Sequence, residues 1–345
     1  MDDKIQVGLI THGAGAHVGA YLQALAAAPH CGEVILVDPD NAWQADAKRV
    51  LGAKLAGVRR DFRQVLRQDP PGMVLVTREA RTAPPVIDAA LEAGCHVFAE
   101  KPACVRVADF APLVQKADAK HRYLMLALAN RTNPEIAAAR QIMRSGRLGK
   151  LFGVEMHLIA DQTRLTRPAY HRQWFAHKER AGGGHLIWLG IHWLDLAMYI
   201  TGSQIVETAG FTTNVGGQPI DIEDSAVAAC RFESGALGTL TSGYYLDKGY
   251  HSHIKIWGSD GWLHLEPMRQ EPLTWYSRQG DQAGQTVVWE GSKEPRGYSP
   301  FVAAAVQACA EMSAPPISNA DSLRALKTVF AIYSSAAEGK AVAIP

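Results

Sequence analysis

A glycine loop near the N-terminus has the spacing needed to bind a dinucleotide. It lies between a strand-like run at 5–10 and a helix-like stretch, and Gly13 and Gly15 are spaced as the first two glycines of G-x-G-x-x-G. Such glycines permit a tight turn and let backbone N–H groups approach a pyrophosphate at a helix N-terminus. Val18 occupies the third position, so a simple tight turn remains an alternative.

A carboxylate about 20 residues further on supports the dinucleotide interpretation. Asp38 ends the second strand-like run, where a carboxylate accepts hydrogen bonds from the adenosine ribose hydroxyls. It would repel a 2′-phosphate, and no Arg or Lys follows before Lys48. We therefore predict NAD rather than NADP, although an Asp in a turn or at a helix N-terminus is a common alternative.

A lysine stands at the end of another strand-like run, in Glu100-Lys101-Pro102. Ligands bind at the carboxyl ends of parallel strands in α/β folds, and the following proline stiffens the turn. Lys101 could donate to a substrate hydroxyl and stabilise developing alkoxide character. A surface lysine at a strand end is the alternative.

A stripe of polar and aromatic residues follows the glycines at 182–184. Its members recur at three- and four-residue steps, so on an α-helix they share one face: His185, Trp188, His192 and Asp195. Each His alone is more often a core residue, but the set suggests a lined cavity. His185 and His192 are seven residues apart, about 10 Å along a helix, so we predict no metal site.

These residues must be positioned by strands and helices, and the sequence shows two different arrangements of them. The first 125 residues alternate continuous apolar runs with helical stretches, which predicts βαβ units and a doubly wound parallel sheet. The strand candidates are 5–10, 33–38, 73–77, 96–100 and 123–128, and the helical stretches are 18–28, about 42–54, 83–94 and 107–119.

After residue 130, turns rather than helices join most strand candidates, which predicts a largely antiparallel sheet. The candidates are 151–160, 205–213, 225–232, 236–246, 251–257 and 261–267, with helices at 134–145, after the glycines at 182–184, and at about 299–313 and 320–337. We therefore expect an α/β protein with a Rossmann domain at 1–125 and an α+β domain at 126–345 that binds substrate and mediates oligomerisation.

The strand candidate at 225–232 is apolar on both faces. Ala226 and Cys230 lie on one face, whereas Val227 and Ala229 lie on the other. Helices can cover one face, so we expect a second subunit on the other.

Composition excludes several classes of partner. The formal net charge is +1, so no general field favours nucleic acid or an anionic membrane. The N-terminus has no secretory pattern, and no stretch is long and apolar enough to span a membrane. Five cysteines without a C-x-x-C pair argue against disulfides and structural zinc, so we expect a cytoplasmic protein.

Across nearly its whole length the sequence resembles the Gfo/Idh/MocA family, which includes glucose–fructose oxidoreductases, inositol dehydrogenases and rhizopine catabolism enzymes. The resemblance rests on Glu-Lys-Pro at 100–102, the triple glycine at 182–184 with Gly190-x-His192-x-x-Asp195, and the motifs at 89–94, 130–134, 145–149, 232–236 and 258–261. It implies a Rossmann domain, an open sheet used for oligomerisation as a homodimer or homotetramer, and hydride transfer between NAD(P) and a carbohydrate or cyclitol carbon.

The resemblance also implies residue roles. Lys101 would orient the reacting hydroxyl and His192 would take its proton during oxidation, a task that suits imidazole. With the pattern above, the expected cofactor-binding residues are Thr11, Gly13, Gly15, Ala16, His17, Val18, Asp38, Thr77, Arg78, Glu100, Lys101 and Asn130. The expected substrate-binding residues are Lys101, Asp161, Trp174, His185, Trp188 and His192.

The sequence departs from the family at important positions. Trp188 stands where the family often has Asp, and Arg78 follows Thr77 where the family has Thr-Pro. An indole cannot accept a proton, although it can stack on the apolar face of a ring. Either His192 works alone, or Asp161 or Asp195 substitutes, or activity is reduced or redirected. A redox-neutral enzyme acting on glycosides with bound NAD, and a non-catalytic NAD-binding protein, therefore remain alternatives.

Overall fold

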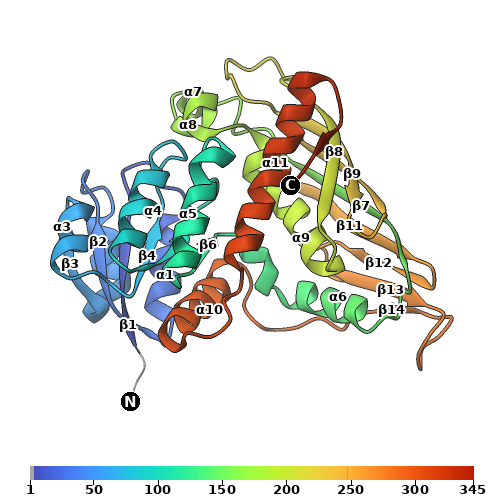
Figure 1. Ribbon diagram of the computed structural model, residues 1–345, viewed down its shortest axis with the longest axis horizontal. Coiled ribbons are helices and arrows are strands. Elements are labelled where there is room, and N and C mark those ends of the chain that lie inside the picture. Colours follow the sequence, from blue (N-terminus) through green and yellow to red (C-terminus); the bar gives the residue numbers. More distant parts are fainter. Residues whose placement is uncertain (1–3, 247) are drawn as a thin grey trace. The chain divides into compact units, whose positions relative to one another are not determined.

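The computed structural model describes residues 4–246 and 248–345, which form two compact units (Figure 1). Among the described residues, the first unit contains 4–132, 179–182 and 295–324, and the second contains 133–178, 183–246, 248–294 and 325–345. Residues 295–324, which we placed in the second domain, thus belong to the first unit.

The first unit is a Rossmann domain, as predicted. Its six strands are all parallel, in the order β3-β2-β1-β4-β5-β6. They are β1 (Ile5–Ile10), β2 (Cys31–Val37), β3 (Leu55–Arg59), β4 (Met73–Val76), β5 (His96–Ala99) and β6 (Leu124–Leu126). Every residue of β4, β5 and β6 is buried, because helices cover both faces of a doubly wound sheet.

The helices of this unit follow the strands, with two additions from later parts of the chain, α8 (Lys178–Ala181) and α10 (Tyr298–Glu311). The others are α1 (Val18–Ala27), α2 (Gln44–Leu51), α3 (Phe62–Gln68), α4 (Ala83–Glu92) and α5 (Val107–Ala119), with 3₁₀ turns η1 (Gly52–Lys54) and η2 (Ala129–Thr132). Helix α10 returns from the C-terminal part of the chain and packs on α1. The sequence analysis missed β3 and α3, and α2 ends at Leu51 rather than at 54.

The second unit is built on a nine-stranded, mostly antiparallel sheet, as predicted. The strand order is β14-β13-β12-β11-β7-β10-β9-β8-β15, and only β7 and β10 pair in parallel. The strands are β7 (Leu151–Asp161), β8 (Ile205–Thr213), β9 (Ser225–Phe232), β10 (Leu237–Leu246), β11 (Tyr250–Gly258), β12 (Gly261–Leu265), β13 (Leu273–Ser277), β14 (Thr286–Val288) and β15 (Val342–Ala343). The last three were not predicted.

Helices lie on one face of this sheet, and Figure 1 shows the other face of its described strands without a helix. The helices are α6 (Pro134–Arg144), α9 (Ile191–Thr201) and the part of α11 (Asn319–Glu338) that belongs to this unit, with short turns α7 (Pro168–His171), η3 (Trp174–Ala176) and η4 (Leu186–Gly190). Alternate residues of β9 are buried and exposed, which confirms the two predicted faces. No helix in the described chain is both long and apolar enough to cross a bilayer.

Candidate functional site

The carboxyl ends of four neighbouring strands bring the predicted cofactor residues to one edge of the Rossmann sheet. Asp38, Thr11, Thr77 and Glu100 directly follow β2, β1, β4 and β5, which are adjacent in that order. All four residues are buried. The sheet topology therefore gathers residues that are 89 positions apart at most into one row, as the fold class requires.

The glycine loop between β1 and α1 is shaped by close packing. A Cβ atom at Gly15 would lie 2.2 Å from Thr11 Oγ1 and 2.9 Å from a Val18 methyl carbon, so only glycine fits there. The Gly13 N–H donates to Asp40 Oδ2 at 2.7 Å. The loop is thus folded on itself, and one of its amides is already engaged by a carboxylate that the sequence analysis did not assign.

The N-terminus of α1 is open to an anion. His17 precedes the helix in the left-handed region, with φ 57°, and no side chain caps the helix or places a carboxylate in its first turn. A Cβ at Gly19 would meet nothing within 4 Å. The N–H groups of this first turn can therefore donate hydrogen bonds to a pyrophosphate, which the helix dipole also attracts.

Asp38 fits a ribose. It is completely buried, and its Oδ2 accepts the Trp43 N–H at 2.7 Å. Its Oδ1 has no hydrogen-bond partner among the described residues. A buried carboxylate oxygen is costly without a donor, and ribose hydroxyls are donors of the expected kind. Trp43, which the sequence analysis did not single out, also donates from Nε1 to the His12 carbonyl at 3.1 Å and so ties Asp38 to the glycine loop.

Thr77 and Arg78 also contact the loop. The Thr77 hydroxyl donates to the Ala16 carbonyl at 2.7 Å, and Arg78 Nη1 donates to the Thr11 carbonyl at 3.1 Å. Burial lowers the pKa of Arg78. The neighbouring Glu79 forms an ion pair with Arg180. The Arg that replaces the family's proline therefore braces the dinucleotide loop.

Glu100 and Lys101 directly follow β5. Glu100 accepts from the Tyr21 hydroxyl and lies 3.2 Å from His17 Nδ1, while the Tyr298 hydroxyl lies 3.1 Å from the same nitrogen. The imidazole of His17 therefore belongs to a cluster around Glu100. Lys101 is 2% exposed and is followed by a cis peptide bond to Pro102. Asn130 lies in η2 and is half-buried.

The triple glycine in the second unit has a steric cause. A Cβ at Gly184 would lie 1.9 Å from the Glu223 carbonyl oxygen, and one at Gly183 would lie 2.1 Å from the Tyr333 hydroxyl. The Glu223 carboxylate accepts from the N–H groups of Gly184 and Leu186 and from the Tyr333 hydroxyl, at 2.7, 3.0 and 2.8 Å. Burial raises the pKa of Glu223. Glu223 thus fastens the start of the helix, a role that nothing in the sequence revealed.

That helix is not a regular α-helix, which corrects one expectation. Residues 186–190 form a π turn, η4, before α9 begins at Ile191. His185 and Asp195 are fully buried, whereas Trp188 and His192 are half-buried. The four residues therefore differ in exposure, and the cavity that they were expected to line stays a prediction.

His185 is held inside the second unit. Its Nδ1 lies 2.6 Å from Ser242 Oγ, and its ring meets the Tyr244 ring edge-on with centroids 4.4 Å apart. These contacts hold the start of the helix against β10. A substrate contact for His185 stays a prediction.

Trp188 belongs to an aromatic cluster within the second unit. Its ring centroid lies 5.3 Å from that of Trp174 and 5.9 Å from that of Phe175, and the last two are 5.7 Å apart. Trp174 is buried, whereas Phe175 is half-buried. The indole at the position of the family's Asp thus packs against η3 and leaves two partly exposed rings.

Asp161 lies at the end of β7, where its Oδ1 accepts the Thr163 N–H at 2.7 Å. Hydrogen bonds from Thr163 lower the pKa of Asp161. A carboxylate of lowered pKa is a weak base, which makes Asp161 a poorer substitute proton acceptor than an imidazole. No group of three His, Cys, Asp or Glu side chains within 4–246 and 248–345 could hold a metal ion.

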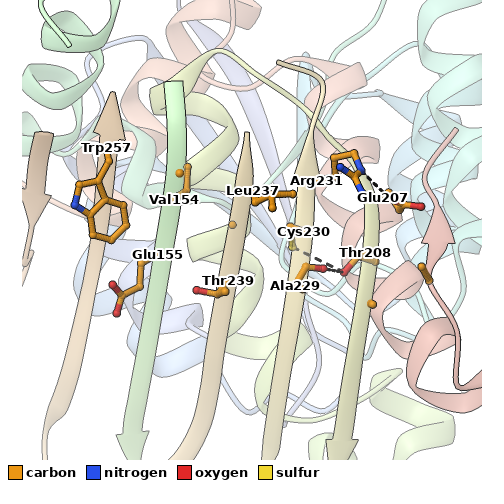
Figure 2. A pocket seen from close by; sticks show the side chains of 14 residues that line it. Val154, Glu155, Glu207, Thr208, Ala229, Cys230, Arg231, Leu237, Thr239 and Trp257 are labelled. Carbon is orange, nitrogen blue, oxygen red and sulfur yellow. Dashed lines mark hydrogen bonds and ion pairs between the residues drawn. The ribbon is translucent and has the colours of Figure 1, made fainter. Parts of the chain in front are cut away.

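A hollow of about 480 Å³ lies on the helix-free face of the nine-stranded sheet, lined mainly by β7–β11 (Figure 2). Residues that pair between neighbouring strands line this hollow. Arg231 of β9 and Glu207 of β8 are one such pair and form a salt bridge. Leu237 and Phe211 on these strands are 58% and 75% exposed. This face carries apolar surface without cover from the described chain.

Comparisons with known proteins match both units. Residues 5–128 match the "Oxidoreductase family, NAD-binding Rossmann fold", and residues 136–264 match the "GFO/IDH/MocA C-terminal domain". The myo-inositol 2-dehydrogenase of Thermotoga maritima is 23% identical over 301 residues, 86% of each chain.

Solved structures agree over almost the full length. An oxidoreductase domain protein from Kribbella flavida is 26% identical with a TM-score of 0.88, covering 99% of each chain. A levoglucosan dehydrogenase in complex with NADH and levoglucosan is 22% identical with a TM-score of 0.85, covering 99% of this chain and 100% of that one. The similarity to the levoglucosan dehydrogenase structure shows the fold alone.

Proposed function

Because the chain belongs to the Gfo/Idh/MocA oxidoreductase family, we propose that it transfers a hydride between NAD and a hydroxyl-bearing carbon of a sugar, glycoside or cyclitol. The observation that carries the cofactor half of this proposal is the buried Asp38 oxygen that lacks a partner in the described chain. The names of relatives, inositol and levoglucosan dehydrogenases, support the substrate half.

NAD would be held by the row of residues at the carboxyl edge of the Rossmann sheet. The first turn of α1 would bind the pyrophosphate, together with the loop before it; the residues concerned are Gly13, Gly15, Ala16 and Val18. Asp38 would bind the adenosine ribose. Thr11, Thr77, Arg78 and Glu100 brace the loop and the strand ends, and His17 and Asn130 complete the proposed set. Once bound, NAD supplies a hydride acceptor.

Lys101 and His192 would act on the substrate hydroxyl. In oxidation the hydroxyl proton goes to the His192 imidazole and the carbon-bound hydrogen leaves as hydride, so that a carbonyl forms. The Lys101 ammonium would hold the hydroxyl oxygen and stabilise its developing negative charge. Half-burial of His192 in a helix whose neighbouring residues are mostly buried suits this role.

Trp188 changes the substrate side. With no carboxylate at this position, His192 has no acidic neighbour four residues earlier, and Asp195 is buried. The partly exposed rings of Trp188 and Phe175 instead offer a surface for the apolar face of a sugar ring. The further proposed substrate residues are Asp161, Trp174 and His185.

Screening tests this proposal directly. Sugars, glycosides and inositols are incubated with NAD, and NADH formation is followed by absorbance. We expect at least one to be oxidised. If none is oxidised, the Trp188 substitution would favour one of two alternatives, a redox-neutral enzyme or a non-catalytic NAD-binding protein. Chromatography of the same mixtures distinguishes these two, because only the redox-neutral enzyme forms products.

Asp38 should decide the choice of dinucleotide. We expect Asp38→Ala to weaken NADH binding about tenfold or more, since the charge-assisted hydrogen bonding of a ribose hydroxyl to this carboxylate is lost. NADPH binding should weaken less or improve, because the repulsion of the 2′-phosphate is removed. Fluorescence titration measures both, with Asp46→Ala on the exposed side of α2 as control. Tighter binding of NADPH than NADH by the unaltered protein would contradict the assignment.

The helix-free sheet face would be covered by a second copy of the chain, giving a homodimer or homotetramer. Its exposed Phe211 and Leu237 are the apolar surface that association would bury. We expect light scattering to give a multiple of 37.4 kDa and the Phe211→Glu and Leu237→Glu double variant to give the monomer. A monomeric unaltered protein would refute the proposal.

All five cysteines are buried and free of disulfides in the structure. Unpaired thiols persist in reducing compartments. The free thiols support our proposal that the protein works in a reducing compartment such as the cytoplasm.

A further inference from the structure

The segment 161–178 concentrates positive charge in a chain that is nearly neutral overall. It contains one carboxylate, Asp161, and four cations: Arg164, Arg167, Arg172 and Lys178. None of the four forms a salt bridge with a described residue, whereas Arg106, Arg180, Arg231 and Arg278 elsewhere all do. The segment lies in the second unit and contains the aromatic residues that pack on Trp188.

Arg164 is the cation of this segment that the fold holds in place. Its guanidinium carbon lies 5.4 Å from the centre of the Tyr244 ring, and the Tyr250 hydroxyl lies beside it. A guanidinium stacked on an aromatic ring keeps its N–H fork in a fixed plane. The residue as a whole is exposed, while its guanidinium is partly buried beside the Tyr244 and Tyr250 hydroxyls.

No described carboxylate neutralises Arg164. Its aromatic neighbours are phenols, and burial raises the pKa of Tyr244 to about 12, so that this ring stays neutral. Asp161 interacts with Arg164 at longer range only, and its Oδ1 is engaged by Thr163. Glu223 is engaged by the helix N-terminus and Tyr333. The fork therefore presents an uncompensated charge.

Arg164 is also connected to the helix of the proposed site. Tyr244, on which it stacks, lies against the ring of His185 at the start of the helix that carries His192. An anion bound by Arg164 would thus sit within the substrate-binding unit rather than on a remote surface.

We propose that the substrate carries an anionic group, a carboxylate or a phosphate on the sugar or cyclitol, and that Arg164 binds this group. The inference rests on the proposed function and narrows its substrate class. Arginine is suited to both anions because its planar fork matches two oxygens at once.

The test compares matched neutral and anionic compounds. D-glucose, D-glucuronate and D-glucose 6-phosphate, and myo-inositol with its monophosphate, are assayed for NADH formation with the unaltered enzyme. We expect an anionic member to have the highest kcat/KM, and the acid and phosphate arms identify which anion. Equal use of neutral and anionic members would overturn the proposal.

Variants then assign the preference to Arg164. We expect Arg164→Gln to lower kcat/KM for the preferred anion about ten- to a hundredfold and to leave neutral compounds nearly unchanged, with Arg164→Lys between them. The matched control is Arg140→Gln, which removes a guanidinium that stacks on Tyr199 at 3.8 Å. Equal losses on neutral and anionic compounds would overturn the assignment.

Two further measurements separate the possible failures. Asp247 lies outside the described residues, and stronger anion binding by Asp247→Asn than by the unaltered protein would show that this carboxylate neutralises Arg164, against the proposal. If no compound yields NADH, the proposed function fails. Calorimetry of D-glucuronate and D-glucose 6-phosphate with the NADH-loaded protein then still decides the anion site, because Arg164→Gln should abolish the binding of either.

Discussion

Replacing Lys101 by Met should lower kcat/KM for sugar or cyclitol oxidation about 10²–10³-fold, and His192→Asn should lower it about 10²–10⁴-fold. The first change removes the cation that stabilises charge on the reacting oxygen, and the second removes the proton acceptor. Steady-state rates of NADH formation measure both. NADH binding by fluorescence should change much less than turnover.

A surface lysine provides the control for this experiment. Lys116 lies on α5 and pairs with Asp88 and Glu92, and Lys116→Met should leave turnover unchanged. Full turnover by Lys101→Met or His192→Asn would show that the proposed roles are wrong. If the double variant lost no more than the worse single variant, the two side chains would be acting on the same step.

Gly184→Ala should cost about 3 kcal/mol or more of folding free energy. Its Cβ would lie 1.9 Å from the Glu223 carbonyl oxygen, and a backbone atom cannot move aside as the end of a flexible side chain can. The change would also separate the Glu223 carboxylate from the Gly184 and Leu186 N–H groups that it accepts from. Denaturant unfolding measures the loss, and activity should fall with it because the same helix carries His192.

Gly19→Ala is the matched control. A Cβ there meets nothing within 4 Å, and the residue lies in α1, where alanine is favoured over glycine by about 1 kcal/mol. We expect Gly19→Ala to be neutral or stabilising in the same unfolding experiment. A Gly184→Ala protein as stable as the unaltered one would mean that the tight contact with Glu223 is absent.

The Rossmann domain was predictable because its central strands are buried on both faces and therefore appear as continuous apolar runs. β3 escaped notice because it is an edge strand, with Gly57 in its centre and no fully buried residue. The return of α10 to this unit was not predictable, since apolar helix faces do not reveal which sheet they cover.

The candidate site was only partly predictable, because its supporting contacts join distant parts of the chain. The triple glycine was recognisable as a motif, but its cause lies in Glu223 and Tyr333, which meet it only in the fold. Likewise Asp38 was found by its spacing from the glycines, whereas Trp43, which orients it, carries no sequence signal of that role.

The π turn at 186–190 also affects how related sequences should be compared. A π turn holds one residue more than an α-helical turn, so side chains beyond it point about 100° away from where an uninterrupted α-helix would direct them. A relative with the same seven-residue spacing but a continuous helix would therefore aim its histidine elsewhere. A relative that lacks one residue within this turn and has a continuous helix would instead direct its histidine as His192 is directed here, because the lost residue is the one that the π turn adds.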